Sequence, residues 1–101
     1  MALFVGIVSY ARPLAFKLCL LSLVHARIVK GIIVAVDVGN IQEKERYMDT
    51  IDKIRKHGLE VIMDFSDKRR GSTNARNKVL DLAEQVLKDD DVFVLYDDDY
   101  V

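Results

Sequence analysis

The chain has 101 residues, half of them hydrophobic, and a net charge of −1. This length suits one small globular domain, which we take to span residues 1–101. A charge balance so close to neutral excludes a protein that holds nucleic acid by bulk positive charge. The single cysteine, Cys19, excludes an internal disulfide, and its apolar surroundings in the sequence predict a core position.

No segment has the length of a membrane span. The most apolar window, residues 14–24, is only 11 residues long and contains Lys17, whereas a spanning helix needs about 20 apolar residues. This window also does not lie at the extreme N-terminus, where a secretory signal would place a basic region first. We therefore expect a soluble, cytoplasmic protein with no transmembrane segment.

The first half of the chain alternates short apolar runs with helical patterns. LFVGIVS at residues 3–9 predicts a strand, and the apolar spacing over residues 14–26 predicts a helix with Pro13 in its first turn. GIIVAVD at residues 31–37 is apolar on both faces, which is typical of a buried parallel strand. A charged helix is then predicted over residues 42–56, with Tyr47, Ile51 and Ile54 as its buried stripe.

The second half repeats this alternation. LEVIMDF at residues 59–65 predicts a third strand, and a polar loop follows it. Ser72 or Thr73 can cap the next helix, which carries an apolar stripe from Val79 onward. DVFVLYD at residues 91–97 predicts the last strand.

The resulting βαβαβαβ order predicts a fold class. Strands joined by helical crossovers form a parallel sheet with helices on both faces. We therefore expect a three-layer, Rossmann-like α/β fold with a four-stranded, mainly parallel sheet. In such folds ligands bind beyond the carboxyl ends of the strands, where the strand order reverses.

Two acidic triplets flank the last strand, and this rule separates them. Asp89–Asp91 precede the strand and Asp97–Asp99 follow it, so about 20 Å of strand lies between them. The first triplet is most simply a solvated turn. The second lies at the carboxyl edge, where its oxygen ligands suit a hard divalent cation such as Mg²⁺ or Mn²⁺; the alternative is an acidic surface turn.

A basic loop ends at the same edge. Between Lys68 and Leu80 there are five basic residues and no acidic one. The loop opens a helix, whose N-terminus favours anions, and arginine suits bidentate contact with phosphate. The loop is therefore a candidate phosphate site; the alternative is an exposed basic turn.

Four segments in this order resemble the nucleotide-binding half of a family 2 glycosyltransferase with the GT-A fold. VSYARP at residues 8–13 resembles the opening T-Y-N-R-P turn of that family, and IVAVDVGN at residues 33–40 resembles its I-V-V-D-D-G-S segment. GSTNARN at residues 71–77 resembles the glycine-led A-R-N segment. LYDDD at residues 95–99 resembles the DxD motif.

The resemblance implies that the ligand is a nucleoside-diphosphate sugar, such as a UDP- or GDP-sugar. Ser9, Tyr10 and Asp37 would cradle the base. Arg70 or Arg76 would lie near the base or the phosphates. The family usually has a second aspartate where this chain has Val38, which removes one polar contact with the base.

The resemblance also assigns roles to the second acidic triplet. Asp98 would approach the ribose, and Asp99 would bind a Mn²⁺ or Mg²⁺ ion that bridges the diphosphate. Asp97 would either bind the metal as well or support its neighbours. No residue is assigned as the catalytic base, so acceptor elements would come from a partner, from a second copy in a homo-oligomer, or from further sequence.

Three functions remain open at this point. The first is a metal-dependent glycosyltransferase or its donor-binding portion. The second is a non-catalytic nucleotide-binding module. The third is a receiver-like or flavodoxin-like signalling domain, which would normally have an acid at the end of its first strand, where this chain has Ser9 and Tyr10.

Overall fold

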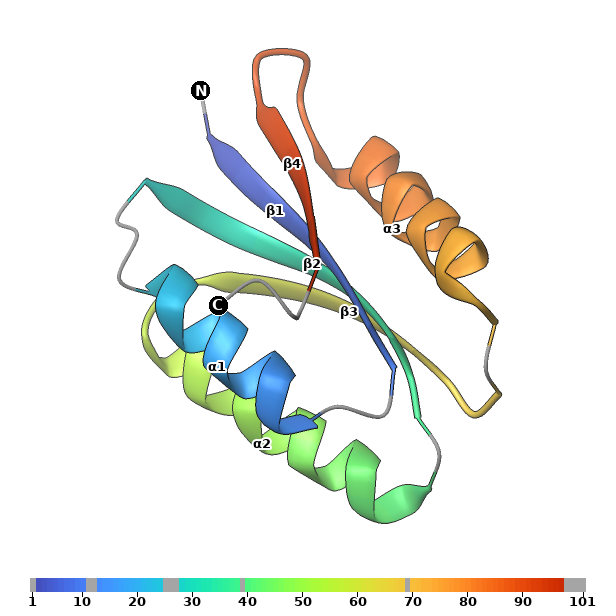
Figure 1. Cartoon of the computed structure of the whole chain (residues 1–101). Helices are drawn as coiled ribbons and strands as arrows, with labels where there is room; N and C mark the ends of the chain where they lie inside the picture. Colours follow the sequence, from blue (N-terminus) through green and yellow to red (C-terminus); the bar gives the residue numbers. More distant parts are fainter. Residues whose placement is uncertain (1, 11–12, 25–27, 39, 69, 98–101) are drawn as a thin grey trace.

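Four strands and three helices alternate along the chain in the computed structural model, which describes residues 2–10, 13–24, 28–38, 40–68 and 70–97. The strands are β1 (Leu3–Tyr10), β2 (Val29–Asp37), β3 (Glu60–Ser66) and β4 (Val92–Asp97). The helices are α1 (Pro13–Val24), α2 (Ile41–Lys56) and α3 (Ser72–Val86) (Figure 1).

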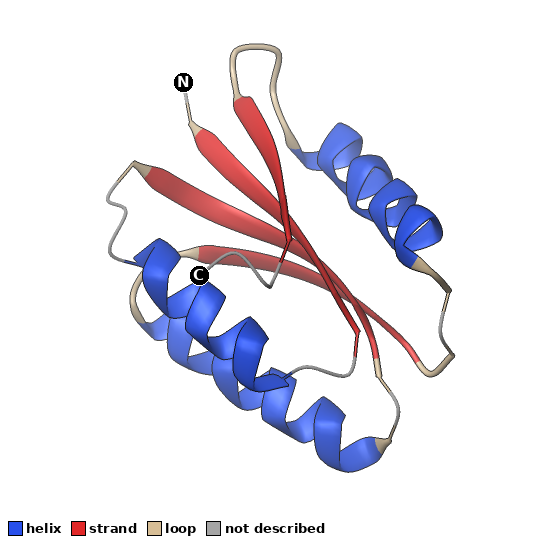
Figure 2. Cartoon of the chain, viewed as in Figure 1, coloured by secondary structure: helices blue, strands red, loops and turns tan. Residues whose placement is uncertain are grey.

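The strands form one sheet in the order β3-β2-β1-β4, and every pair is parallel. Helices α1 and α2 cover one face of the sheet, and α3 covers the other (Figure 2). The predicted three-layer, Rossmann-like α/β fold is confirmed. The sheet is parallel throughout, since each crossover returns the chain to the same end of the sheet before the next strand begins.

The core has two layers because the central strands are buried on both faces. The layer under α1 and α2 includes the buried Cys19 and Tyr47, as predicted. The layer under α3 is smaller, and Phe93 of β4 packs against it. Its buried members are Val8, Ile33, Ala35, Ala75, Val79 and Ala83.

Several predicted boundaries shift by one or two residues. Strand β2 begins at Val29 instead of residue 31, while β3 lies one residue later than predicted. Helix α1 is described as far as Val24, and the rest of the predicted 14–26 helix lies outside the described residues. Strand β4 begins at Val92 because Asp91 belongs to the preceding turn, where its carboxylate accepts hydrogen bonds from the Lys88 and Ala2 backbone N–H groups.

The prediction that Ser72 or Thr73 caps the third helix is wrong. The N-cap is Gly71, and Ser72 is already the first helical residue. Gly71 has φ 87° and ψ 156°, a backbone conformation that is essentially restricted to glycine. The cap has no side-chain hydrogen bond, so the backbone conformation of glycine, and not a hydroxyl acceptor, defines the start of α3.

Candidate functional site

The carboxyl ends of all four strands meet at one edge of the sheet. Tyr10 and Asp37 are register partners there, and Asp37 also pairs in register with Ser66. Asp97, the last residue of β4, is the register partner of Val8. From β1 the chain proceeds to β2 and β3 on one side, and β4 then lies on the other side of β1, so the strand order reverses between β1 and β4. Helix α1, which follows β1, and helix α3, which precedes β4, cover opposite faces of the sheet. Open α/β sheets bind ligands at such a reversal.

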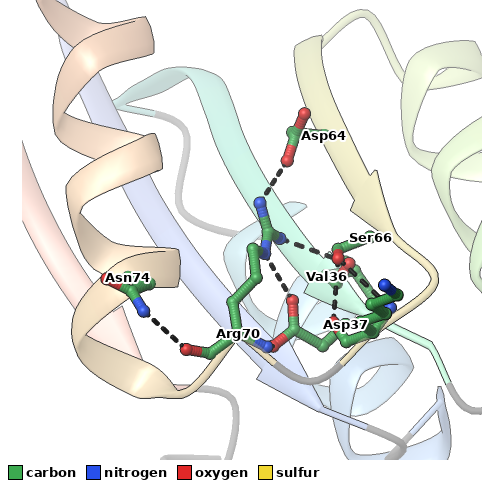
Figure 3. Close-up of polar contacts among 7 residues, drawn as sticks. Val36, Asp37, Asp64, Ser66, Arg70 and Asn74 are labelled. Carbon is green, nitrogen blue, oxygen red and sulfur yellow. Dashed lines mark hydrogen bonds and ion pairs between the residues drawn. The ribbon is translucent and has the colours of Figure 1, made fainter.

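An ion cluster around Arg70 lies at this edge, next to the ends of β2 and β3 (Figure 3). The backbone N–H of Arg70 donates to one carboxylate oxygen of Asp37 at 2.8 Å, and its Nε donates to the other oxygen at 2.7 Å. One terminal nitrogen of the guanidinium pairs with Asp64, and the other donates to the Val36 carbonyl at 3.4 Å. Arg70 therefore connects the ends of β2 and β3 to the loop that leads into α3.

The two carboxylates lie on the same sheet face for a reason visible in the register. Asp64 is the register partner of Ala35, and Asp37 follows Ala35 by two residues on the same strand. Because side chains alternate along a strand, Asp37, Asp64 and Ala35 all point toward the α3 side. The loop that carries Arg70 enters α3 on that side, and this brings the guanidinium onto both acids.

The cluster is partly removed from water. The side chain of Asp37 is only 3% exposed, and that of Arg70 is 20% exposed. Partial burial lowers the pKa of Arg70, but the hydrogen bonds and charges of Asp37 and Asp64 outweigh it, and the pKa of the guanidinium is raised. A buried carboxylate without a partner is costly, so this pairing is a structural requirement as well as a candidate ligand contact.

Asp64 was missed by the sequence analysis. The signal was present, because Asp64 is the one charged residue after the first position of the strand segment EVIMDFS. An acid in a strand that packs against the core calls for a cation nearby, and the closest candidates in sequence were the basic residues at 68–70.

Ser9 does not share a sheet face with Asp37. It lies two residues after Ile7 on β1 and therefore points toward α1 and α2, where its hydroxyl is 2.7 Å from that of Tyr47 in the buried core. Tyr10 is the next residue, so it shares the face of Asp37, and its side chain is exposed. Of the predicted nucleotide-binding residues, Asp37 and Arg70 are in contact, and Tyr10 is the register partner of Asp37 on the neighbouring strand.

The remaining predicted residues are placed less fully. Arg76 is exposed on α3, beside the buried Ala75. The backbone of Asp97 ends β4, while Asp98 and Asp99 lie outside the described residues. Within the described ranges, no three His, Cys, Asp or Glu side chains come together as a metal site, and the predicted ligand Asp99 lies outside those ranges.

A small cavity of about 190 Å³ opens at the same edge of the sheet, at the start of α2. Its lining comes from the loops after β2 and β3 and from the start of α2. Asn40 caps α2 by accepting a hydrogen bond from the Glu43 N–H, and the Lys44 Nζ lies 5.7 Å from the centre of the Phe65 ring. The lining residues are Val38, Asn40, Ile41, Lys44 and Asp67.

The first acidic triplet lies at the opposite end of the sheet, as predicted. Asp89 and Asp90 are exposed in the turn before β4, and Asp91 accepts the two hydrogen bonds that shape this turn. The backbone N–H of Lys88 lowers the pKa of Asp91, and the Ala2 N–H, Lys30 and the N-terminus lower it further. This triplet is a structural turn.

No known protein family matches the chain, and no curated protein matches it. None of the helices in the described part of the chain is long and apolar enough to cross a membrane.

Proposed function

We propose that the protein binds a nucleoside-diphosphate sugar at the carboxyl edge of its sheet and acts as a glycosyltransferase or as the donor-binding part of one. The observation that carries this proposal is the position of the four segments that resemble family 2 glycosyltransferases. Three of them contain the carboxyl end of a strand, and the fourth contains the start of α3, in a parallel sheet with the strand order β3-β2-β1-β4. Open α/β sheets of this order bind nucleotides at that edge.

The described residues provide groups suited to the nucleoside. The exposed ring of Tyr10 lies on the same face as Asp37 and offers an apolar surface for a base. A guanidinium has five N–H groups, and in the described part of the chain three of those of Arg70 donate to Asp37, Asp64 and Val36. The other two are available to acceptor groups of a ligand.

The second acidic triplet provides groups suited to a metal. Its carboxylate oxygens are the ligands that Mg²⁺ and Mn²⁺ prefer, and Asp97 and Asp99 are the residues that would hold the ion. When bound, such an ion supplies Lewis-acid stabilisation of the departing diphosphate. Asp98, between them, would contact the ribose, and Arg76 near the start of α3 would approach the phosphates.

The strand order favours this proposal over a signalling domain. Flavodoxin-like and receiver-like sheets have the order 2-1-3-4-5, in which the third strand lies beside the first. Here β3 lies beside β2, and β4 occupies the other side of β1. The non-catalytic nucleotide-binding module uses the same site as the enzyme, so turnover has to separate the two.

A ligand panel tests the proposal. The melting temperature of the protein is measured with UDP, GDP, UDP-glucose and GDP-mannose, each with and without Mn²⁺. We expect at least one ligand to raise the melting temperature only when Mn²⁺ is present, because the metal bridges protein and diphosphate. Hydrolysis or transfer of the sugar would identify an enzyme. Metal-dependent binding without turnover would identify a binding module, and no response to any nucleotide would contradict the proposal.

A further inference from the structure

Strand β3 forms an outer edge of the sheet. It is the first strand in the order β3-β2-β1-β4, and no strand in the described ranges pairs with its outer side (Figure 1). The Val38 N–H donates to the Ser66 carbonyl at 2.9 Å, so Ser66 directs its backbone groups toward β2. Because this direction alternates along a strand, Val61, Met63 and Phe65 direct their N–H and C=O groups to the outer side. Through such groups an edge strand can pair with another chain.

One of these outward groups already has a partner, which comes from α2. A terminal nitrogen of the Arg55 guanidinium donates to the Val61 carbonyl at 2.8 Å. Arg55 lies in the basic last turn of α2, and this helix packs on the sheet face to which Val61 points. The exposed arginine therefore places its charge where a further strand would have to lie. Charged side chains at a sheet edge are a common protection against pairing with other chains.

The sequence of β3 is suited to antiparallel pairing with a second copy of itself. The strand has seven residues, Glu60–Ser66, with Met63 at its centre. A two-fold axis through Met63 would pair the whole strand and would place Val61 opposite Phe65, a favourable β-branched and aromatic pair. The remaining pairs would be Ile62 with Asp64 and Glu60 with Ser66. No acid would lie opposite an acid, so the full-length register avoids charge repulsion between the strands.

The bond from Arg55 competes directly with this pairing. In the two-fold arrangement the Val61 carbonyl would accept the Phe65 N–H of the second copy, and symmetry would repeat that bond. We propose that Arg55 blocks a self-complementary edge, so that β3 stays unpaired while the guanidinium holds the Val61 carbonyl and pairs with a second copy when the guanidinium is removed. The inference concerns the sheet edge, and it does not depend on nucleotide binding.

Arg55→Ala tests the proposal, because it removes the guanidinium from the edge and keeps a good helix former in α2. Lys53→Ala, at an exposed position of the same helix, is the control, since it changes the net charge equally. Sedimentation velocity at several protein concentrations measures the dimer dissociation constant. We expect Arg55→Ala to lower this constant at least about tenfold, because one competing hydrogen bond is lost in each of the two copies. Lys53→Ala should match the wild type.

Amide hydrogen exchange followed by NMR identifies the surface. In Arg55→Ala, exchange of the three outward amides of β3 should slow as the protein concentration rises, while the amides that point to β2 should show no such change. Substitutions at Ile62 in the same background then test the register, because this position would face Asp64 of the second copy. Ile62→Glu should weaken the dimer and Ile62→Lys should strengthen it.

The wild type provides a comparison that needs no variant, since its outward β3 amides should exchange at rates independent of protein concentration. The unfolding midpoint of each variant shows that it is folded. A wild type that already pairs through β3 would overturn the proposal. So would an Arg55→Ala variant as monomeric as the wild type, or one that associates without protecting the outward amides.

Discussion

The carboxylate of Asp37 accepts hydrogen bonds from both the backbone N–H and the side-chain Nε of Arg70, which follows it by 33 residues. The first bond fixes the loop before α3, and the second fixes the direction of the guanidinium. A single buried acid thus determines where the backbone and the charge of this loop lie. The candidate nucleotide site and the stability of the fold therefore share the same residues.

Replacing Arg70 should destabilise the protein strongly. Arg70→Ala leaves the 3%-exposed Asp37 with the backbone N–H but without its counter-ion. Removing one partner of a buried pair typically costs 3–5 kcal/mol, and we expect about 3 kcal/mol here because one hydrogen bond remains. Urea unfolding measures the loss, and Arg46→Ala, at an exposed position of α2, serves as the control.

Asp64 should no longer contribute to the free energy of unfolding once Arg70 is replaced. A double-mutant cycle with Asp64→Ala and Arg70→Ala should give a coupling free energy between about 0.5 and 3 kcal/mol, the range for residues in direct contact. Additive effects of the two substitutions would mean that Asp64 acts independently of Arg70, which is contrary to the geometry of the cluster.

The start of α3 should depend on Gly71 and not on the hydroxyl of Thr73. Gly71→Ala forces a side chain into a backbone conformation with φ 87°, and this should cost about 1–3 kcal/mol. Thr73→Ala, at an exposed helical position, should change the free energy of unfolding by less than about 0.5 kcal/mol. A larger loss in free energy of unfolding for Thr73→Ala than for Gly71→Ala would mean that Thr73 is the cap.

Gly6 should tolerate no side chain while Phe93 is present. A Cβ at Gly6 would collide with the Phe93 ring and lie 2.7 Å from Val79, because the ring packs across β1 beneath α3. We expect Gly6→Ala to cost about 1–3 kcal/mol, as overpacked core positions do. In a Phe93→Leu background the same substitution should cost clearly less; an unchanged cost would place the strain elsewhere.

The turn before β4 should weaken in acid. Hydrogen bonds from the Lys88 and Ala2 N–H groups favour the charged carboxylate, so the pKa of Asp91 is lowered in the folded state. Its contribution to stability is then fully present above its unfolded pKa of about 3.9 and is lost as the pH falls through the folded pKa.

Asp91→Asn removes this titration. The difference in free energy of unfolding between the wild type and the variant should be constant near neutral pH and should shrink below about pH 4, where the wild-type carboxylate becomes protonated. Urea unfolding between about pH 2.5 and 7 measures it. If the free energies of unfolding of the wild type and the variant differed by the same amount over that whole pH range, the role given to Asp91 would be contradicted.

Much of the fold was predictable because hydrophobic periodicity reports burial directly. The apolar run at 31–37 indicated a strand buried on both faces, and α2 showed its inward stripe at Tyr47, Ile51 and Ile54. The start of β2 was less visible, since the alternation of Val29 and the exposed Lys30 breaks the apolar run while the backbone pairing continues.

The site was less predictable because it depends on register and side-chain direction. The register that places Asp64 beside Ala35 cannot be read from either strand alone. Ser9 was expected in the crevice, but its position on β1 turns its hydroxyl into the core toward Tyr47. The glycine cap also escaped prediction, because a hydroxyl next to Gly71 matched the usual N-cap pattern.

The central claim is that the second acidic triplet holds a metal–diphosphate complex, and one calorimetric comparison tests it most directly. The affinity for UDP or GDP, whichever the ligand panel selects, is measured in the presence of Mn²⁺ for Asp99→Ala and for Asp89→Ala, which removes the corresponding charge from the first triplet at the opposite end of the sheet. We predict that Asp99→Ala abolishes the Mn²⁺-dependent part of the affinity while Asp89→Ala retains it. Equal affinities for the two variants and the wild type would contradict the claim.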